Sequence, residues 1–123
     1  MWRDFFPNAQ IYGADTLPQL VFHDDRIETF RCDQTVKKDL ENLIAKTGSD
    51  IDLFIDDGSH LPKDQVFTCL TVMPMLKKSV IYLIEDAGAS QVIETYLGNF
   101  DYHIIKFKNA RYRDDKLIVV KQK

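Results

Sequence analysis

Two short apolar runs, each followed by a pair of carboxylates, constrain the fold of this chain most strongly. Residues 51–55 lead into Asp-Asp-Gly-Ser-His at 56–60, and residues 80–84 lead into Glu-Asp at 85–86. Continuous runs rich in β-branched and aromatic residues are typical of strands buried on both faces. Because residues 62–77 between them have the apolar spacing of a helix, the unit predicts two parallel strands joined by a helix.

Both acidic pairs are expected at one edge of the sheet, because parallel strands of this kind end on the same side. Carboxylates gathered without a basic partner repel one another, unless a cation lies among them. Oxygen ligands suit Mg²⁺, Ca²⁺ or Mn²⁺, and His60 stands close enough to Asp57 to act as a base beside such a metal. The alternative is that these acids are solvated loop residues or helix caps. Two pairs at equivalent strand ends, with a histidine beside one, favour the metal site.

Three polar residues follow strands that are predicted earlier in the chain. Asp15 ends a strand at residues 9–14, and Asp33 and Gln34 end a strand at residues 27–32. An acid at the first of these places commonly accepts hydrogen bonds from ribose hydroxyl groups, and the second pair could meet the edge of a purine. Local roles are equally open, because Asp15 could cap the turn that follows it and Asp33 the next helix.

The rest of the chain completes a single α/β domain over residues 1–123. Pro62 suits the first turn of the helix between the two apolar runs, and Pro74 should break or kink it. Further elements are expected as follows: a helix at residues 1–6, a helix at 36–47 capped by Thr35 and ended by Gly48, a short helix capped by Ser90 and ended by Gly98, and antiparallel strands at 102–108 and 116–121 joined by a turn at 113–115.

The composition excludes several classes of function. The formal net charge of −3 argues against general binding of nucleic acids or anionic membranes, and no apolar stretch approaches the ~20 residues that span a bilayer. The N-terminus shows no basic segment followed by an apolar run, as a secretory signal would. Cys32 and Cys69 lie in apolar surroundings and are predicted to be buried, reduced thiols. We therefore expect a cytoplasmic protein.

Four motifs, in order and spacing, resemble the macrolide sugar O-methyltransferases of the macrocin and mycinamicin type. They read Phe-Pro-Asn-Ala-Gln-Ile-Tyr-Gly-Ala-Asp at 6–15, Asp-Gln at 33–34, Ile-Asp-Asp-Gly-Ser-His at 55–60 and Tyr-Leu-Ile-Glu-Asp at 82–86. The resemblance runs from Trp2 to about residue 86. It implies a class I methyltransferase fold, which is a Rossmann-like three-layer α/β sandwich with a mostly parallel sheet and a C-terminal antiparallel strand. It also implies S-adenosylmethionine as the cofactor and a bound Mg²⁺.

The resemblance implies a role for each motif residue. Asp57, Glu85 and Asp86 would hold Mg²⁺ or Mn²⁺. His60 would be the general base that takes the proton from a hydroxyl of the acceptor, a sugar or polyol in a small molecule. Three contacts with S-adenosylmethionine are implied as well. Asp15 would meet the ribose, and Asp33 with Gln34 would meet the adenine side. Asp56 would lie at the methionine end or in the layer behind it.

One part of the family pattern is missing. Such enzymes begin with a strand and a Gly-rich loop that cradle the cofactor, whereas the earliest glycine here is Gly13. In this fold the missing strand lies between the strands at Ile11 and Leu53, so two strand edges would lack partners. The chain could be a fragment of a longer gene, the two half-sheets could close on each other, or another chain could fill the gap. The exposed edges and the aromatic residues of the opening helix favour a homodimer or higher oligomer.

The leading interpretation is therefore a metal-dependent O-methyltransferase that acts on a sugar or polyol hydroxyl. A cephalosporin-hydroxylase-like enzyme is one alternative, since those sequences also place acids at these strand ends. A catalytically inactive remnant that binds a metal or a partner chain is another, because a fold does not fix a function. Without the Gly-rich loop, we expect this chain alone to bind S-adenosylmethionine no better than in the high micromolar range, with a binding free energy of roughly −5 kcal/mol or weaker.

Overall fold

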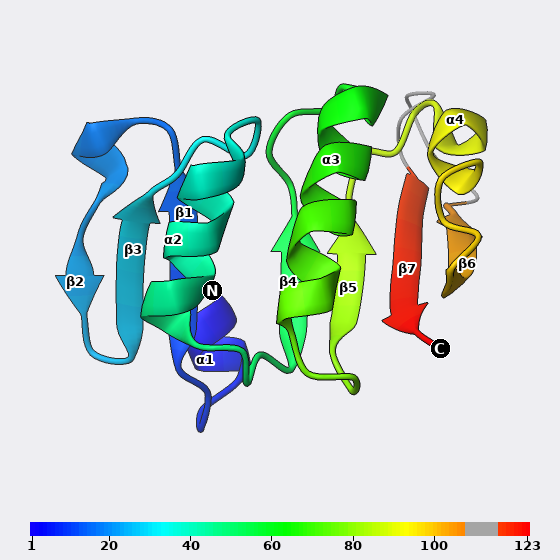
Figure 1. Cartoon of the computed structure of the whole chain (residues 1–123). Coiled ribbons are helices and arrows are strands. Elements are labelled where there is room, and N and C mark those ends of the chain that lie inside the picture. Colours follow the sequence, from blue (N-terminus) through cyan, green and yellow to red (C-terminus); the bar gives the residue numbers. More distant parts are fainter. Residues whose placement is uncertain (108–115) are drawn as a thin grey trace.

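The computed structural model describes residues 1–107 and 116–123, and its strands form two separate sheets (Figure 1). The first sheet has the order β1-β3-β2. Its strands are β1 (Ile11–Asp15), β3 (Ile27–Arg31) and the two-residue β2 (His23–Asp24). The strands β1 and β3 are parallel, and β2 is antiparallel to β3. The sequence predicted β1 and β3, whereas β2 and the short 3₁₀ helix η1 (Pro18–Leu20) were not predicted.

The second sheet has the order β4-β5-β7-β6 and contains the predicted strand–helix–strand unit. Its strands are β4 (Leu53–Asp56), β5 (Ile81–Ile84), β7 (Lys116–Gln122) and β6 (Phe100–Lys106). As predicted, β4 and β5 are parallel, so the residues that follow them leave the same edge. The closing strands are antiparallel, as expected. The turn predicted at 113–115 and the end of the strand predicted at 102–108 lie outside the described residues.

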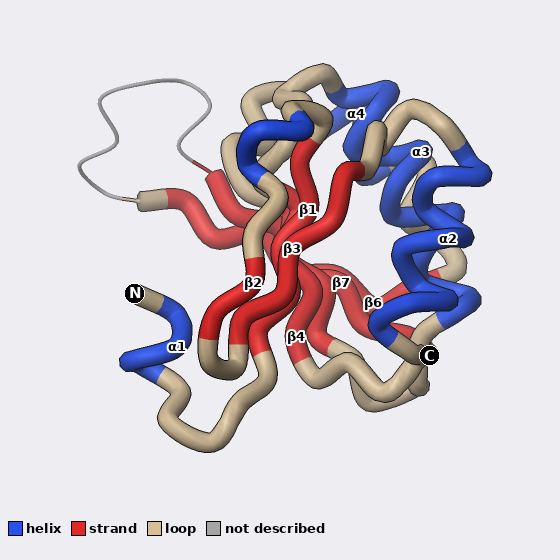
Figure 2. The backbone as a smooth tube through the Cα atoms, turned by 90° about the vertical axis from the view of Figure 1, so that its left-hand side faces the viewer, coloured by secondary structure: helices blue, strands red, loops and turns tan. Residues whose placement is uncertain are grey.

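The helices α2 (Lys37–Thr47), α3 (Pro62–Val72) and the short α4 (Ser90–Glu94) lie on one side of the sheets. The helix α1 (Trp2–Phe5) lies on the other side (Figure 2). Pro62 starts α3 as predicted, and around Pro74 the helix gives way to the 3₁₀ turn η2 (Met73–Met75), because proline cannot continue the hydrogen-bond ladder. Within the described residues, no helix is long and apolar enough to cross a membrane.

Both predicted caps were wrong. No side chain caps α2, because the helix begins after Val36 and leaves Thr35 one residue outside the capping position. The Thr35 hydroxyl donates to the carboxylate of Asp33. Ser90 is not a cap either, since it is the first residue of α4 and is buried. Gly48 does end α2: its positive φ of 81° is one that glycine adopts readily, and its N–H bonds to the carbonyl of Ile44. The helix α4 ends at Glu94, earlier than predicted.

The main core lies between the second sheet and the helices. Side chains alternate along the strands, so Tyr82 and Ile84 of β5 are fully buried while Ile81 on the opposite face is 39% exposed. The rings of Phe54 and Tyr82 stack at 4.9 Å between centroids, which places these two residues on the same face. Both cysteines are buried and free, as predicted. The other fully buried core residues include Cys69, Val72, Met73, Val80, Ile93, Leu97, Ile118 and Val120.

The two sheets do not join through their strands. The strands β1 and β4 lie at the neighbouring edges of the sheets and point the same way, yet the described backbone shows no pairing between them (Figure 1). The possibility that the half-sheets close directly on each other is therefore wrong. Leu53, Phe54 and Ile55 are only half-buried, which is unusual for a strand that would lie centrally in a larger sheet.

Candidate metal and acid–base site

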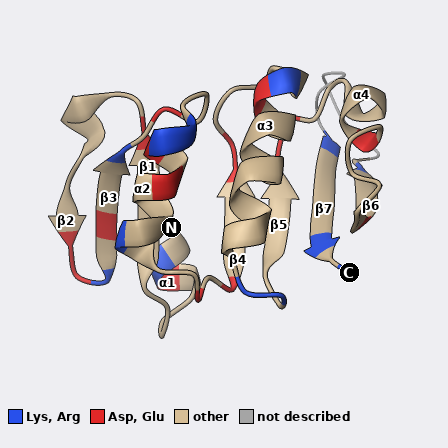
Figure 3. Ribbon diagram, in the orientation of Figure 1, with Lys and Arg blue, Asp and Glu red and all other residues tan. Residues whose placement is uncertain are grey.

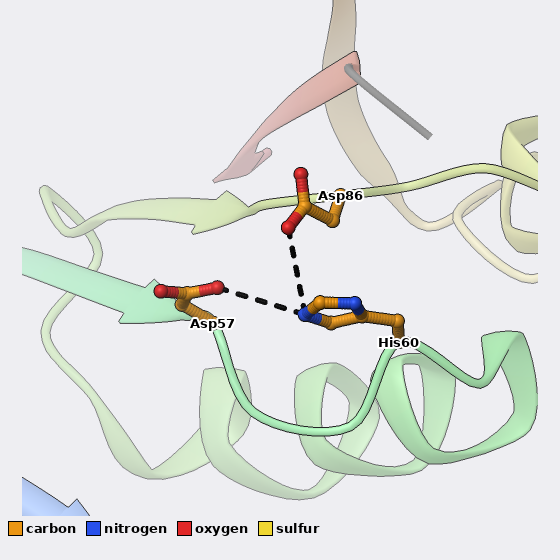
Figure 4. Close-up of side chains that lie close together, drawn as sticks. All are labelled: Asp57, His60 and Asp86. Carbon is orange, nitrogen blue, oxygen red and sulfur yellow. Dashed lines mark ion pairs between the residues drawn. The ribbon is translucent and has the colours of Figure 1, made fainter. Parts of the chain in front are cut away.

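Three of the predicted site residues converge at the end of β4 and β5. Asp57, His60 and Asp86 each offer one ligand atom, and these atoms lie within 4.8 Å of one another. The Nε2 atom of His60 is 3.8 Å from Oδ1 of Asp57 and 3.5 Å from Oδ2 of Asp86. Figure 4 shows the imidazole pointing between the two carboxylates. Asp57 and His60 come from the loop after β4 and Asp86 from the loop after β5, because parallel pairing brings both loops to one edge.

The donor set fits a hard divalent cation. The side chains of Asp57, His60 and Asp86 are 58%, 49% and 39% exposed, so the cluster is open to solvent. Acidic segments follow β4 and β5 at the same end of the molecule (Figure 3). Within the described ranges, neither aspartate of the cluster pairs with a lysine or arginine, so no permanently charged side chain offsets their repulsion. Carboxylate oxygens of this kind suit Mg²⁺ or Mn²⁺.

Glu85, the third predicted metal ligand, is not among the three converging residues. Burial raises the pKa of its carboxyl, and the negative charges of Asp57 and Asp86 raise this pKa further. The Glu85 carboxyl is therefore within electrostatic range of both aspartates. Its backbone is fixed on both sides: its N–H donates to the carbonyl of Asp56 at 3.0 Å, and its carbonyl accepts from Nε2 of Gln65 at 2.8 Å. The structure thus places Glu85 beside the cluster, and its role as a ligand stays a prediction.

Asp86 has a left-handed backbone conformation with φ of 49°. Aspartate and asparagine tolerate this region better than other non-glycine residues. The carbonyl of Asp86 accepts a hydrogen bond from the N–H of Gly88 at 2.8 Å, which holds the tight turn. The turn thus restricts which side chains suit this position and aims the loop after β5 towards His60.

Asp56, predicted to lie near the methionine end of the cofactor or behind it, is buried at 5% exposure. Its Oδ1 accepts from Nε2 of Gln34 at 3.1 Å and its Oδ2 from the hydroxyl of Tyr82 at 3.2 Å. Burial raises the pKa of Asp56 to about 6, although the hydrogen bonds from Gln34, Tyr82 and the backbone of Gly58 act in the opposite direction. Asp56 therefore lies in the interior behind Asp57.

The predicted cofactor residues Asp15 and Asp33 both bond locally: Asp15 makes the turn contact that was its alternative, whereas Asp33 bonds to Thr35 and does not cap α2. Oδ1 of Asp15 accepts from the N–H of Leu17 at 2.8 Å, and Oδ1 of Asp33 accepts from the N–H and hydroxyl of Thr35 at 2.9 and 2.6 Å. The bonds from Thr35 lower the pKa of Asp33. These bonds use one oxygen of each carboxylate in the described structure, so a role in binding the cofactor stays a prediction for both residues.

Gln34 makes contacts that its sequence motif did not indicate. Its Nε2 donates to Oδ1 of Asp56 and, at 2.9 Å, to the hydroxyl of Thr68. Its Oε1 accepts from the backbone N–H of Ser59. The side chain therefore points to the loop after β4, and the predicted contact with adenine is not tested by this arrangement.

Sequence reasoning missed four residues that support the site. They are Ser59, whose hydroxyl bonds to Asp64 at 2.7 Å, and Gln65, Thr68 and Tyr82, which hold Glu85, Gln34 and Asp56. A signal existed for Tyr82, because alternation along paired strands puts it on the same face as Phe54 and Asp56. The sequence contains no comparable signal for the polar residues on the inner face of α3.

Solved structures of methyltransferases match nearly the whole chain. MycE methyltransferase from the mycinamycin biosynthetic pathway, in complex with Mg and SAH, has a TM-score of 0.71 at 22% identity over 98% of this chain and 38% of that chain. A SAM-dependent methyltransferase from Anabaena variabilis has a TM-score of 0.61 at 12% identity over 99% of this chain and 71% of that chain. The fold is therefore the Rossmann-like fold of S-adenosylmethionine-dependent methyltransferases.

Relatives found by sequence show which methyltransferases this chain is similar to. A tetracenomycin-C 3′-O-methyltransferase from Streptomyces olivaceus is 35% identical over 86 residues, which are 70% of this chain and 22% of that protein. Mycinamicin VI 2″-O-methyltransferase from Micromonospora griseorubida is 34% identical over 70% of this chain and 21% of that protein. No family model matches. The chain spans about a fifth of the length of these relatives, and over that stretch its similarity to macrolide sugar O-methyltransferases is confirmed.

Proposed function

We propose that this chain forms part of a metal-dependent O-methyltransferase that transfers the methyl group of S-adenosylmethionine to a hydroxyl of a sugar or polyol in a small molecule. The observation that carries the proposal is the convergence of Asp57, His60 and Asp86 at the ends of two parallel strands. Two features of the relatives support it: their names describe O-methylation, and MycE carries Mg and SAH. A cytoplasmic location, without nucleic-acid or membrane partners, belongs to the same proposal.

Each residue of the cluster has a defined task in this reaction. Asp57 and Asp86 would hold Mg²⁺ or Mn²⁺, with Glu85 as an additional ligand. A divalent cation bound there lowers the pKa of a coordinated hydroxyl and orients it. His60 would take the hydroxyl proton, since its Nε2 lies 3.8 Å from Asp57 and 3.5 Å from Asp86, beside the place where the cation would hold the hydroxyl. The acceptor oxygen would then attack the methyl carbon of S-adenosylmethionine as the bond between that carbon and the sulfonium sulfur breaks, which leaves S-adenosylhomocysteine, so the main contribution of the protein is positioning.

The contacts with S-adenosylmethionine would come from the ends of β1 and β3. Asp15 would accept from the ribose hydroxyls, and Asp33 with Gln34 would face the adenine side. Asp56 would act from behind the methionine end, since it is buried. Calorimetry with the cofactor should give a dissociation constant no better than the high micromolar range, roughly −5 kcal/mol. Submicromolar binding would show that a Gly-rich loop is not needed.

Titration of the chain with Mn²⁺ or Mg²⁺ tests the proposed function. We expect Asp57→Asn and Asp86→Asn to weaken binding at least tenfold, about 1.4 kcal/mol each. Glu85→Gln should weaken it less, because its carboxylate lies outside the converging cluster. Asp50→Asn is the control, since Asp50 is exposed and pairs with Lys77 instead. Equal metal affinity in the wild type and all variants would refute the site.

The unpaired edges of β1 and β4 support self-association as a further part of the proposal. Each edge presents backbone donors and acceptors without partners in the described structure. The opening helix adds apolar surface, since Trp2 is 42% exposed and Phe5 71% exposed. Pairing with a second copy would satisfy both features. Light scattering at low micromolar concentration should therefore show a dimer or larger species, and a monomer that unfolds cooperatively would exclude it.

A further inference from the structure

We propose that Gln34 is a positioning residue that holds the loop carrying Asp57 and His60 in place against the half of the domain that contains β1 and β3. The inference rests on the proposed function, because the loop matters as the carrier of the metal and base residues. The inference concerns the contact between the Asp-Gln motif at 33–34 and the loop after β4, which are separate motifs in the sequence.

The side chain of Gln34 reaches from the first sheet to the second. Gln34 follows β3, and its partners belong to β4, to the loop after β4 and to α3. Its Nε2 lies 3.1 Å from Oδ1 of Asp56 and 2.9 Å from Oγ1 of Thr68, and its Oε1 accepts from the N–H of Ser59. Both amide hydrogens and the carbonyl oxygen are therefore used.

The contact is important because the two sheets share no described strand pairing. In a continuous sheet, backbone hydrogen bonds would fix the end of β3 relative to the end of β4. Here the side chain of Gln34 connects these ends directly, since it bonds to residues on both sides of Asp57 and next to His60. Gln34 thus relates the predicted cofactor side at Asp33 to the cluster at Asp57 and His60.

Gly58 lies directly against the side chain of Gln34. A Cβ atom at Gly58 would overlap Oε1 of Gln34 and lie 3.1 Å from its Cδ. The glycines with positive φ in the described structure do not include Gly58, so its backbone would accept alanine. Alanine at position 58 would therefore require the amide of Gln34 to leave its hydrogen-bonded position, and removal of that side chain should make alanine tolerable.

A double-mutant cycle tests the inference with the full chain and Mn²⁺ as the probe. We expect Gln34→Ala and Gly58→Ala each to weaken Mn²⁺ binding about tenfold, and the double variant to be no weaker than Gln34→Ala. Hydrogen exchange of the Ser59 amide, measured by NMR without metal, should accelerate at least tenfold in Gln34→Ala. Gln122→Ala is the matched control, because its amide also donates two hydrogen bonds, to the carbonyls of Met73 and Leu76, outside the cluster. It should lower the melting temperature and leave Mn²⁺ affinity unchanged.

The outcomes separate this inference from the proposed function. If the wild type binds no Mn²⁺, the proposed function fails, and exchange at Ser59 alone decides whether Gln34 holds the loop. If the wild type binds Mn²⁺ but Gln34→Ala binds it equally well, the positioning role is overturned. Additive effects of Gln34→Ala and Gly58→Ala, or unchanged protection of the Ser59 amide, would overturn it as well.

Discussion

Replacing Asp56 with asparagine should remove a pH dependence from the stability of the fold. Burial raises the pKa of this carboxyl from 3.8 to about 6, so the folded chain holds the proton more tightly than the unfolded chain. A difference of about two pKa units corresponds to about 3 kcal/mol. The contribution to stability is fully present below about pH 4 and is lost as the pH rises through about 6, because ionisation then occurs inside the protein.

This pH dependence of the unfolding free energy can be measured by urea unfolding of the wild type and Asp56→Asn. The buffers run from about pH 4 to pH 8 and contain a chelator. Asparagine keeps the shape: its oxygen can accept from Gln34 and its amide can donate to the hydroxyl of Tyr82. The unfolding free energy of the variant relative to the wild type should therefore rise by about 2–3 kcal/mol across the series. Glu85 also has a raised pKa, but it is present in both proteins and cancels in the comparison.

Parallel stability curves for the two proteins would refute the reasoning, because they would mean that Asp56 titrates alike in the folded and unfolded chains. A variant that loses stability relative to the wild type as the pH rises would also refute it. That result would show that the hydrogen bonds to the carboxylate outweigh its burial.

Three further predictions follow from the buried groups. Tyr82→Phe removes a bond to Asp56, so it should lower the unfolding free energy by about 1 kcal/mol and move the titration of Asp56 to higher pH in the same urea series. Leu40→Ala should cost about 2–5 kcal/mol because Leu40 is 2% exposed, whereas Val36→Ala, at a position 42% exposed, should cost far less in chemical denaturation. Burial raises the pKa of Cys69 to about 12, so at pH 8 a disulfide reagent should modify this thiol only as the chain unfolds; immediate labelling would contradict its burial.

The sequence predicted the elements whose signals are local and repeated. The apolar runs before Asp56 and Glu85 predicted that β4 and β5 are parallel strands. From that pairing followed the convergence of Asp57 with Asp86 at one edge of the sheet. The caps were wrong by one residue: α2 begins after Val36 and α4 after Ala89, so Thr35 and Ser90 do not occupy the capping positions. The residue at which a helix begins depends on backbone angles that spacing does not reveal.

The buried and the exposed acid at the end of β4 were not distinguished from the sequence, although the alternation of side chains along the strand indicates which is which. Asp56 belongs to β4 and shares the inner face with Phe54, whereas Asp57 lies beyond the strand and is exposed. The contact between Gln34 and the loop after β4 joins residues more than twenty positions apart. Contacts of this kind arise from packing and leave no periodic pattern in the sequence.

The missing ladder between β1 and β4 also bears on how the domain unfolds. Backbone hydrogen bonds make a sheet cooperative, so two sheets that share no strand pairing in the described part of the chain can act as two folding units coupled by helix packing and side chains. No residue of β1, β2 or β3 is buried, whereas β5 and β7 contain fully buried side chains. Native-state hydrogen exchange should thus fall into two groups, with the amides of β1 and β3 opening at lower free energy than those of β5 and β7.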